Sequence, residues 1–318
     1  IKTMNILHDT CRLVFVYLGR LPEYVIYSLK INSKYNRITL LHDCEIQNHV
    51  ANVEYINIDD FYDRRQFVNL IAESPLKNFR DGFWYKTTER FYVLRSYMDH
   101  YNVHAIFHAE LDNIVYNLEG VSISLDKIGN GLFYPILNNK KAAASFMYIN
   151  SFSELDALIG YFNEQKTFKD DMQLLAEYAS ASVNVFPLPS ENSLCKMPVS
   201  NEVQCIYDAA SIGQYLLGID FRNASRPIFN GFQNENCIID LSQLKFIQDG
   251  DKGILMFYDQ AIYLLKNIHV HSKVFKRMYL SESYVPRIMK KINGGKKSLM
   301  SLNFKNMIKL FLDKSKLL

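Results

Sequence analysis

The first sixty residues alternate between short apolar runs and one segment with helical spacing. Residues 12–19, 37–42 and 53–58 are apolar runs with β-branched and aromatic members, which is typical of buried strands. Between the first two runs, Leu21 and Pro22 open a segment whose apolar residues recur at helical spacing, and proline is tolerated in a first helical turn. We therefore predict a β-α-β unit with parallel strands and a right-handed crossover.

The rest of the chain continues to mix the two periods. Residues 83–102 predict a long helix that leads directly into an apolar strand at 103–109. A further helix begins after Asp208, whose side chain suits an N-cap, and ends at Gly218. Further strands or extended segments are expected at residues 142–148, 183–189, 238–244, 253–258 and 263–276, and further helices at 153–164 and 170–180. This order of elements predicts the α/β class.

Two acids follow the strand at 103–109. Glu110 and Asp112 stand one residue apart at its carboxyl end, the edge where open α/β sheets place their ligands. Two carboxylates at this spacing suit Mg²⁺ or Mn²⁺. A solvated acidic turn is the more common reason for such an isolated pair. Farther along, His269 and His271 alternate in the extended stretch at 263–276, so they are expected on one face, either as ligands or as a solvated strand face.

Charge and cysteine content narrow the possible functions. The net charge of +3 is too small for a dedicated nucleic-acid binder, and nine of the 36 basic residues lie after position 283 with only one acid. Five cysteines without a C-x-x-C spacing favour neither a disulfide framework nor a zinc site, and indicate a reducing cytosol. We expect neither a signal peptide nor a membrane span. Residues 296–318 have the pattern of a basic amphipathic helix, which either binds a membrane surface or packs on its own domain.

Four segments resemble nucleotide-sugar-dependent glycosyltransferases of the GT-A fold. They occur in the same order as in that family, and the resemblance covers nearly the whole chain up to about Arg277. Glu110-Leu111-Asp112 stands at the place of the D-x-D metal motif, although its first acid is Glu. The other three segments are residues 14–22, Lys169-Asp170-Asp171 and residues 268–273. The chain looks closest to bacterial transferases that build capsules or lipopolysaccharides, through residues 83–91 and 208–215.

This resemblance implies a mixed, mostly parallel sheet flanked by helices. It implies a nucleotide-binding half at 1–118, an acceptor half at 119–283, and a basic amphipathic tail at 284–318. Mn²⁺ or Mg²⁺ would be held by Glu110, Asp112 and one histidine, with His271 preferred over His269. For Arg90, the alternatives to a phosphate contact are surface solvation and a salt bridge to an acid. The residues expected at the donor are Tyr17, Leu18, Gly19, Trp84, Arg90, Asn113 and Lys273.

The implied activity transfers a sugar from a nucleotide-diphosphate sugar, foremost a UDP-sugar, to a glycan or lipid-linked glycan in surface polysaccharide synthesis. If the reaction inverts the anomeric centre, the expected base is Asp171, with Asp208 as second choice; if it retains configuration, these acids position substrate. The tail would place the enzyme on the inner face of the cytoplasmic membrane. The alternatives are a nucleotidyltransferase, for which residues 18–20 give only a thin Gly-rich basic loop, and a non-catalytic membrane-associated module of a glycan assembly complex.

Overall fold

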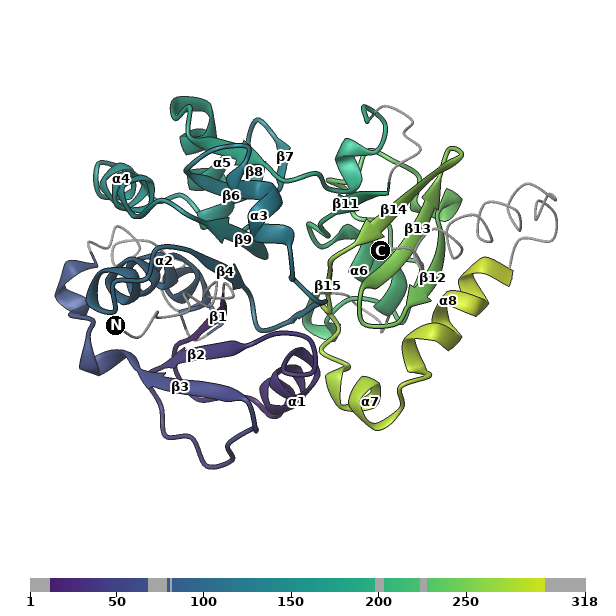
Figure 1. Ribbon diagram of the computed structural model, residues 1–318, viewed down its shortest axis with the longest axis horizontal. Helices are drawn as coiled ribbons and strands as arrows, with labels where there is room; N and C mark the ends of the chain where they lie inside the picture. Colours follow the sequence, from purple (N-terminus) through teal and green to yellow (C-terminus); the bar gives the residue numbers. More distant parts are fainter. Residues whose placement is uncertain (1–11, 68–78, 81, 198–202, 224–227, 295–318) are drawn as a thin grey trace, which may run out of the picture.

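The computed structural model describes residues 12–67, 79–80, 82–197, 203–223 and 228–294. Its main sheet has seven strands in the order β10-β6-β9-β4-β1-β2-β3 (Figure 1). Strand β9 runs antiparallel to β4 and β6, and the other neighbours are parallel, so the predicted mixed and mostly parallel sheet is confirmed. The strands are β1 Arg12–Tyr17, β2 Ile38–His42, β3 Val53–Asn57, β4 Ile106–Ala109, β6 Leu132–Tyr134, β9 Phe146–Ile149 and β10 Val185–Pro187.

Helices cover both faces of this sheet, which is why its strands read as nearly continuous apolar runs. In β1, Val14 faces α2, α4 and α5, while Leu13 and Phe15 face α1 and α3. The predicted β-α-β unit is confirmed, with α1 between the parallel strands β1 and β2. The helices are α1 Glu23–Asn32, α2 Phe83–His100, α3 Val121–Asp126, α4 Phe152–Asn163 and α5 Asp171–Ala181.

A second sheet and its helices form a separate hydrophobic core in the later part of the chain. Its strand order is β11-β14-β13-β12, with α6 and α8 packed beside it (Figure 1). The elements are β11 Gln204–Ile206, β12 Lys245–Asp249, β13 Gly253–Tyr258, β14 Ala261–Leu265, α6 Ser211–Leu217, α7 Phe275–Leu280 and α8 Tyr284–Gly294. The main sheet takes strands from both sides of residue 118, and the second sheet begins with β11.

The two sheets are joined by a short antiparallel pair, β5 Asn113–Val115 and β15 Asn267–His269, which lies between them (Figure 1). This pair brings the end of β4 beside a segment from the second core. Among the residues that the structure describes, the remaining elements are a small hairpin and five 3-10 turns: β7 Ile136–Asn138, β8 Lys141–Ala142, η1 Ile58–Asp60, η2 Arg64–Gln66, η4 Glu191–Ser193, η5 Phe221–Asn223 and η6 Leu241–Gln243.

Three sequence expectations about elements differ from the structure. Residues 238–244 are not a strand, because Asp240 accepts a hydrogen bond from the Ser242 amide and caps η6, and β12 begins only at Lys245. The extended stretch expected at 263–276 is divided into β14, β15 and α7. The strand expected at 142–148 is interrupted, since β8 ends at Ala142 and β9 begins at Phe146.

The beginning of the predicted tail belongs to the folded body. Helix α8 buries Val285 and Met289 against the second core, and it packs on β12 and α6. The amphipathic helix predicted at 296–318 lies outside the described residues. Among the residues that are described, no helix is both long and apolar enough to span a bilayer.

Candidate metal and diphosphate site

Glu110 and Asp112 lie on the turn between β4 and β5, and helix α1 holds this turn through two hydrogen bonds. The Ser28 hydroxyl donates to the carbonyl of Leu111 at 2.6 Å, and Asn32 Nδ2 donates to the carbonyl of Asn113 at 2.9 Å. Both polar side chains are fully buried. Sequence reasoning missed these two supports, although polar residues on the buried face of an apolar helix were a usable signal.

His269 completes a possible metal-ligating group with the two acids. Its Nε2 lies 2.9 Å from Asp112 Oδ2 and 3.9 Å from Glu110 Oε2, and all three ligand atoms fall within 4.8 Å of one another. Two carboxylates and an imidazole form a donor set that suits Mn²⁺ better than the harder Mg²⁺. The group therefore fits a divalent cation.

His271, which we preferred from the sequence, lies away from the acids. Its Nδ1 accepts a hydrogen bond from the backbone N–H of Asp220 at 2.8 Å, and its Nε2 lies 3.0 Å from Asn223 Nδ2. The period-two expectation fails because β15 ends at His269, so the chain turns before His271. His269 therefore replaces His271 in the metal-ligating group.

Lys273 is a cation in direct contact with this group. Its ammonium pairs with the Asp112 carboxylate and lies 5.5 Å above the ring of Tyr24. Burial raises the pKa of Asp112, but His269 and Lys273 oppose this and hold that pKa well below its ordinary value. The backbone of Lys273 has a φ of +57°, which is uncommon for a residue with a side chain and places the ammonium beside the acids.

Arg90 joins the metal-ligating group to Asp171. The guanidinium is buried, pairs through Nη1 with Glu110, and donates from Nη2 to Asp171 Oδ2 at 2.7 Å. The alternative of a salt bridge is thus realised, in the interior and with two acids. Asp170 is the N-cap of α5, so Asp171 takes the first helical position and is buried. Burial raises the pKa of Asp171 to about 6, against the opposing charge of Arg90.

Asp208, the second candidate base, lies fully buried and supports the metal-ligating group from behind. Its carboxylate accepts hydrogen bonds from the backbone N–H groups of Ile212, Gly213 and His269 at 2.8–3.0 Å. Glu191, which sequence reasoning missed, is equally buried and accepts hydrogen bonds from the backbone N–H groups of Ala209 and Ser211 at 3.0 and 3.2 Å. Burial and their mutual proximity raise the pKa of Asp208. Asp208 therefore anchors α6 and β15.

Asn113 is also interior. Its side chain is fully buried, with Oδ1 accepting from Asn267 Nδ2 at 2.9 Å and Nδ2 donating to the carbonyl of Glu110 at 3.3 Å. The contact with a ribose or sugar hydroxyl expected for Asn113 is therefore not available in this arrangement. Asn113 instead locks β5 to β15.

The other expected donor residues lie along the end of β1 and the start of α2. Leu18 is buried in the core, and the Tyr17 hydroxyl donates to the carbonyl of Arg20 at 3.0 Å. Gly19 has a φ of +98° and its amide donates to Asp43 Oδ1 at 2.6 Å. Trp84 stacks on Phe79, with ring centroids 6.2 Å apart. No described contact joins these residues directly to Glu110 or Asp112.

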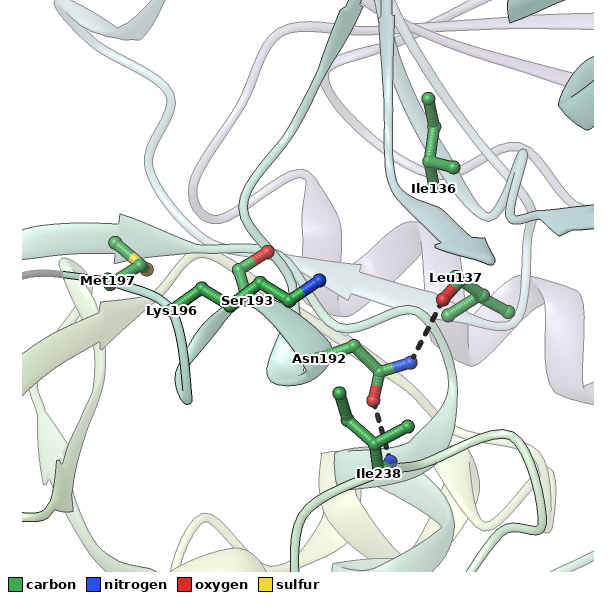
Figure 2. A pocket seen from close by; sticks show the side chains of 7 residues that line it. All are labelled: Ile136, Leu137, Asn192, Ser193, Lys196, Met197 and Ile238. Atoms are coloured by element: carbon green, nitrogen blue, oxygen red, sulfur yellow. Dashed lines mark hydrogen bonds between the residues drawn. The ribbon is translucent and has the colours of Figure 1, made fainter. Parts of the chain in front are cut away.

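A pocket of about 320 Å³ lies apart from the acids, beside β7 and η4 (Figure 2). Asn192 braces it, because its side chain donates to the carbonyl of Leu137 at 3.4 Å and accepts from the Ile238 amide at 3.0 Å. Its lining is Ile136, Leu137, Asn192, Ser193, Lys196, Met197 and Ile238. None of the residues predicted to be functional belongs to this lining.

Neither a family model nor a curated protein matches this sequence. Among solved structures, an active-site mutant of LgtC is 13% identical, with 60% of this chain and 79% of that chain covered and a TM-score of 0.36. Mouse xyloside xylosyltransferase 1 is 10% identical, with 56% and 85% covered and a TM-score of 0.37. The glycosyltransferase GlyE of Streptococcus pneumoniae TIGR4 is 14% identical, with 57% and 45% covered and a TM-score of 0.37. Solved glycosyltransferases are thus among the structures to which this chain is similar, the class that its sequence resembles.

Proposed function

We propose that this chain is a metal-dependent glycosyltransferase that uses a nucleotide-diphosphate sugar, with a UDP-sugar as the foremost donor. The supporting observation is the group Glu110, Asp112 and His269 at the carboxyl edge of the sheet, with Lys273 beside it. These three residues would hold a divalent cation, which would supply positive charge to the leaving diphosphate. Lys273 adds a second positive charge at the same place.

The residues around this group divide the remaining work. When the bond between the sugar C1 and the phosphate oxygen breaks, negative charge develops on the diphosphate, and Lys273 stabilises it. Arg90 keeps Glu110 and Asp171 at fixed positions, since it pairs with both. In an inverting reaction, Asp171 takes the proton of the acceptor hydroxyl while the hydroxyl oxygen bonds to C1. In a retaining reaction, the same carboxylate positions the acceptor.

We further propose that the acceptor is a glycan or a lipid-linked glycan of surface polysaccharide synthesis, and that the enzyme works at the cytoplasmic face of a membrane. The tail supports this, because residues 295–318 carry six lysines and one acid among apolar residues at helical spacing. Helix α8 adds exposed Arg287, Lys290 and Lys291 directly before that segment.

Two features weigh against the alternatives. A nucleotidyltransferase needs free backbone amides in a loop after the first strand to hold phosphates, whereas the Gly19 amide already donates to Asp43. A non-catalytic module has no need for two acids and a histidine that converge from separate parts of the chain.

The test is a thermal-shift screen of nucleotide sugars with and without Mn²⁺, followed by product analysis for the donors that bind. We expect stabilisation by one nucleotide-diphosphate sugar only when Mn²⁺ is present, and loss of this effect in Asp112→Asn. Release of pyrophosphate from a nucleoside triphosphate would identify a nucleotidyltransferase instead. No shift with any nucleotide or with Mn²⁺ would contradict the proposal.

A further inference from the structure

The segment Asp220–Asn223 lies beside the metal-ligating group and is fastened there by His271. The backbone N–H of Asp220 donates to His271 Nδ1 at 2.8 Å, and the Asn223 side chain lies 3.0 Å from Nε2 of the same ring. The rings of His269 and His271 are 6.0 Å apart. One histidine thus faces the acids, while its neighbour holds a segment from a different part of the chain.

Arg222 projects from this segment with a fixed direction. Asp220 accepts hydrogen bonds from the Arg222 backbone N–H at 2.9 Å and from its Nε at 3.0 Å, and also pairs with Nη2. The Asp220 side chain is 7% exposed, whereas that of Arg222 is 52% exposed. Within the described part of the chain, no acceptor is bonded to Nη1. Asp220 therefore orients one edge of the guanidinium and leaves the other edge for a ligand.

The charge of Arg222 acts on the same space as the acids of the metal-ligating group. Tyr24 lies within electrostatic range of Arg222 and of the two acids. Burial raises the pKa of Tyr24, Asp112 and Glu110 raise it further, and Arg222 lowers it. Lys273 lies above the Tyr24 ring and pairs with Asp112. Lys273 and Arg222 thus both act on Tyr24, which is also within electrostatic range of Glu110 and Asp112.

A third cation, Arg80, also contacts this segment. Arg80 lies just before α2, and its Nη2 donates to Asn223 Oδ1 and to the carbonyl of Arg222, the latter at 3.3 Å. Lys273 thus pairs with the metal-ligating group, and Arg222 and Arg80 lie at the segment beside it. An anion of two or more charges that also ligates a metal is the ligand that this arrangement suits, and a diphosphate is such an anion.

We propose that Arg222 binds the diphosphate of the donor on the side away from the metal, and that Asp220 and His271 are positioning residues that aim it. The inference rests on the proposed function and deepens it, because it assigns different tasks to the two histidines. His269 faces the cation, and His271 holds the segment Asp220–Asn223, from which Arg222 contacts the leaving diphosphate. A substrate without a diphosphate has no group for Arg222 to bind.

Inorganic pyrophosphate is the probe, since it contains the diphosphate without any base or sugar. Titration calorimetry on the full chain measures Mn²⁺ alone and then pyrophosphate in the presence of Mn²⁺. We expect Arg222→Ala and His271→Ala each to weaken pyrophosphate binding about tenfold or more, the value of a lost charge-assisted hydrogen bond. Both variants should bind Mn²⁺ alone as the wild type does. The double variant should lose no more than either single variant, because His271 acts through Arg222.

The chain supplies a matched control. Arg65 forms with Asp63 the same local arrangement, with bonds from its backbone N–H, Nε and Nη2, but on an exposed turn. Arg65→Ala removes an equivalent pair and should leave pyrophosphate affinity unchanged. Arg222→Lys, which keeps the charge, should recover part of the affinity.

The results distinguish failure of this inference from failure of the proposed function. If the wild type binds pyrophosphate with Mn²⁺ and Arg222→Ala binds it equally well, only the role of Arg222 is overturned. Loss of Mn²⁺ affinity in His271→Ala would show that His271 is a metal ligand. Additive losses in the double variant would show that His271 acts independently of Arg222. If the wild type binds neither Mn²⁺ nor pyrophosphate, both proposals fail.

Discussion

His269 lies directly opposite Asn113 in the antiparallel pair of β5 and β15. This register places the His269 imidazole 2.9 Å from Asp112, although 157 residues separate them. Asp112→Asn and His269→Ala should therefore each weaken Mn²⁺ binding by two orders of magnitude or more, because second-sphere changes alone cost roughly 10–100-fold. Titration of the metal into the purified chain measures this. Retention of wild-type Mn²⁺ affinity in both variants would contradict a metal site at these residues.

The sequence predicted the parts of this site that depend on local pattern. Glu110 and Asp112 follow an apolar run, and the end of a parallel strand is where such acids collect. The expectation that His269 and His271 share one face failed because period two applies only while a strand continues. Strand β15 ends at His269, and the next amide, that of Val270, donates to the Asp112 carbonyl at 2.6 Å. That contact depends on a distant pairing, which no local pattern contains.

The burial of Asp208 and Asn113 was unpredictable for a related reason. For a polar residue of this kind, the sequence pattern does not distinguish contact with a ligand from a hydrogen bond within the protein. In the structure, Asp208 accepts three backbone N–H groups and Asn113 bonds Asn267. The fold of the first β-α-β unit, in contrast, followed from apolar runs and one proline, because neighbouring residues determine it.

Gly213 offers a test of the support behind His269. A Cβ at this position would lie 2.1 Å from the carbonyl oxygen of His269, a backbone atom, so the backbone of β15 or α6 must shift. Gly213→Ala should weaken Mn²⁺ binding without removing any ligand and should lower the melting temperature. The control is Gly160→Ala in α4, where a Cβ would meet nothing within 4 Å. That change should stabilise the helix by up to about 1 kcal/mol. Equal Mn²⁺ affinity in both variants would contradict the role of this contact.

The buried position of Asp171 makes a prediction about pH. Because burial raises its pKa to about 6, the carboxylate form that accepts a proton increases as the pH rises through 6. If Asp171 is the base, kcat/KM for transfer should rise through pH 6 and level above it. Asp171→Asn should lower transfer by roughly 10²–10⁴-fold and abolish this limb, while donor affinity stays near wild type. An active variant with an unchanged profile would leave Asp171 only as a partner of Arg90.

Lys273 should show opposite effects on the two ligands. Its ammonium pairs with Asp112, so a divalent cation must compete with it for that carboxylate. Lys273→Met keeps the length of the side chain but removes the charge. We expect stronger binding of Mn²⁺ alone and weaker binding of pyrophosphate in the presence of Mn²⁺. Calorimetry on the same protein preparation gives both values. Weakening of both ligands together would indicate a misfolded site, and an unchanged pyrophosphate affinity would exclude Lys273 from the phosphates.

The tail predicts where the enzyme works. Each basic residue near an anionic bilayer contributes about 1 kcal/mol at moderate ionic strength, and residues 295–318 carry six lysines. Met300, Phe304, Met307, Ile308 and Phe311 recur at helical spacing, so an apolar face is available for the interface. The full chain should co-sediment with phosphatidylserine-containing vesicles at low salt and much less with neutral phosphatidylcholine vesicles. Removal of residues 296–318 should release it, whereas charge reversal at Lys290 and Lys291 on α8 should weaken binding only in part. Equal sedimentation with and without the tail, or with both kinds of vesicle, would show that its apolar residues pack within the protein and leave no support for a membrane location.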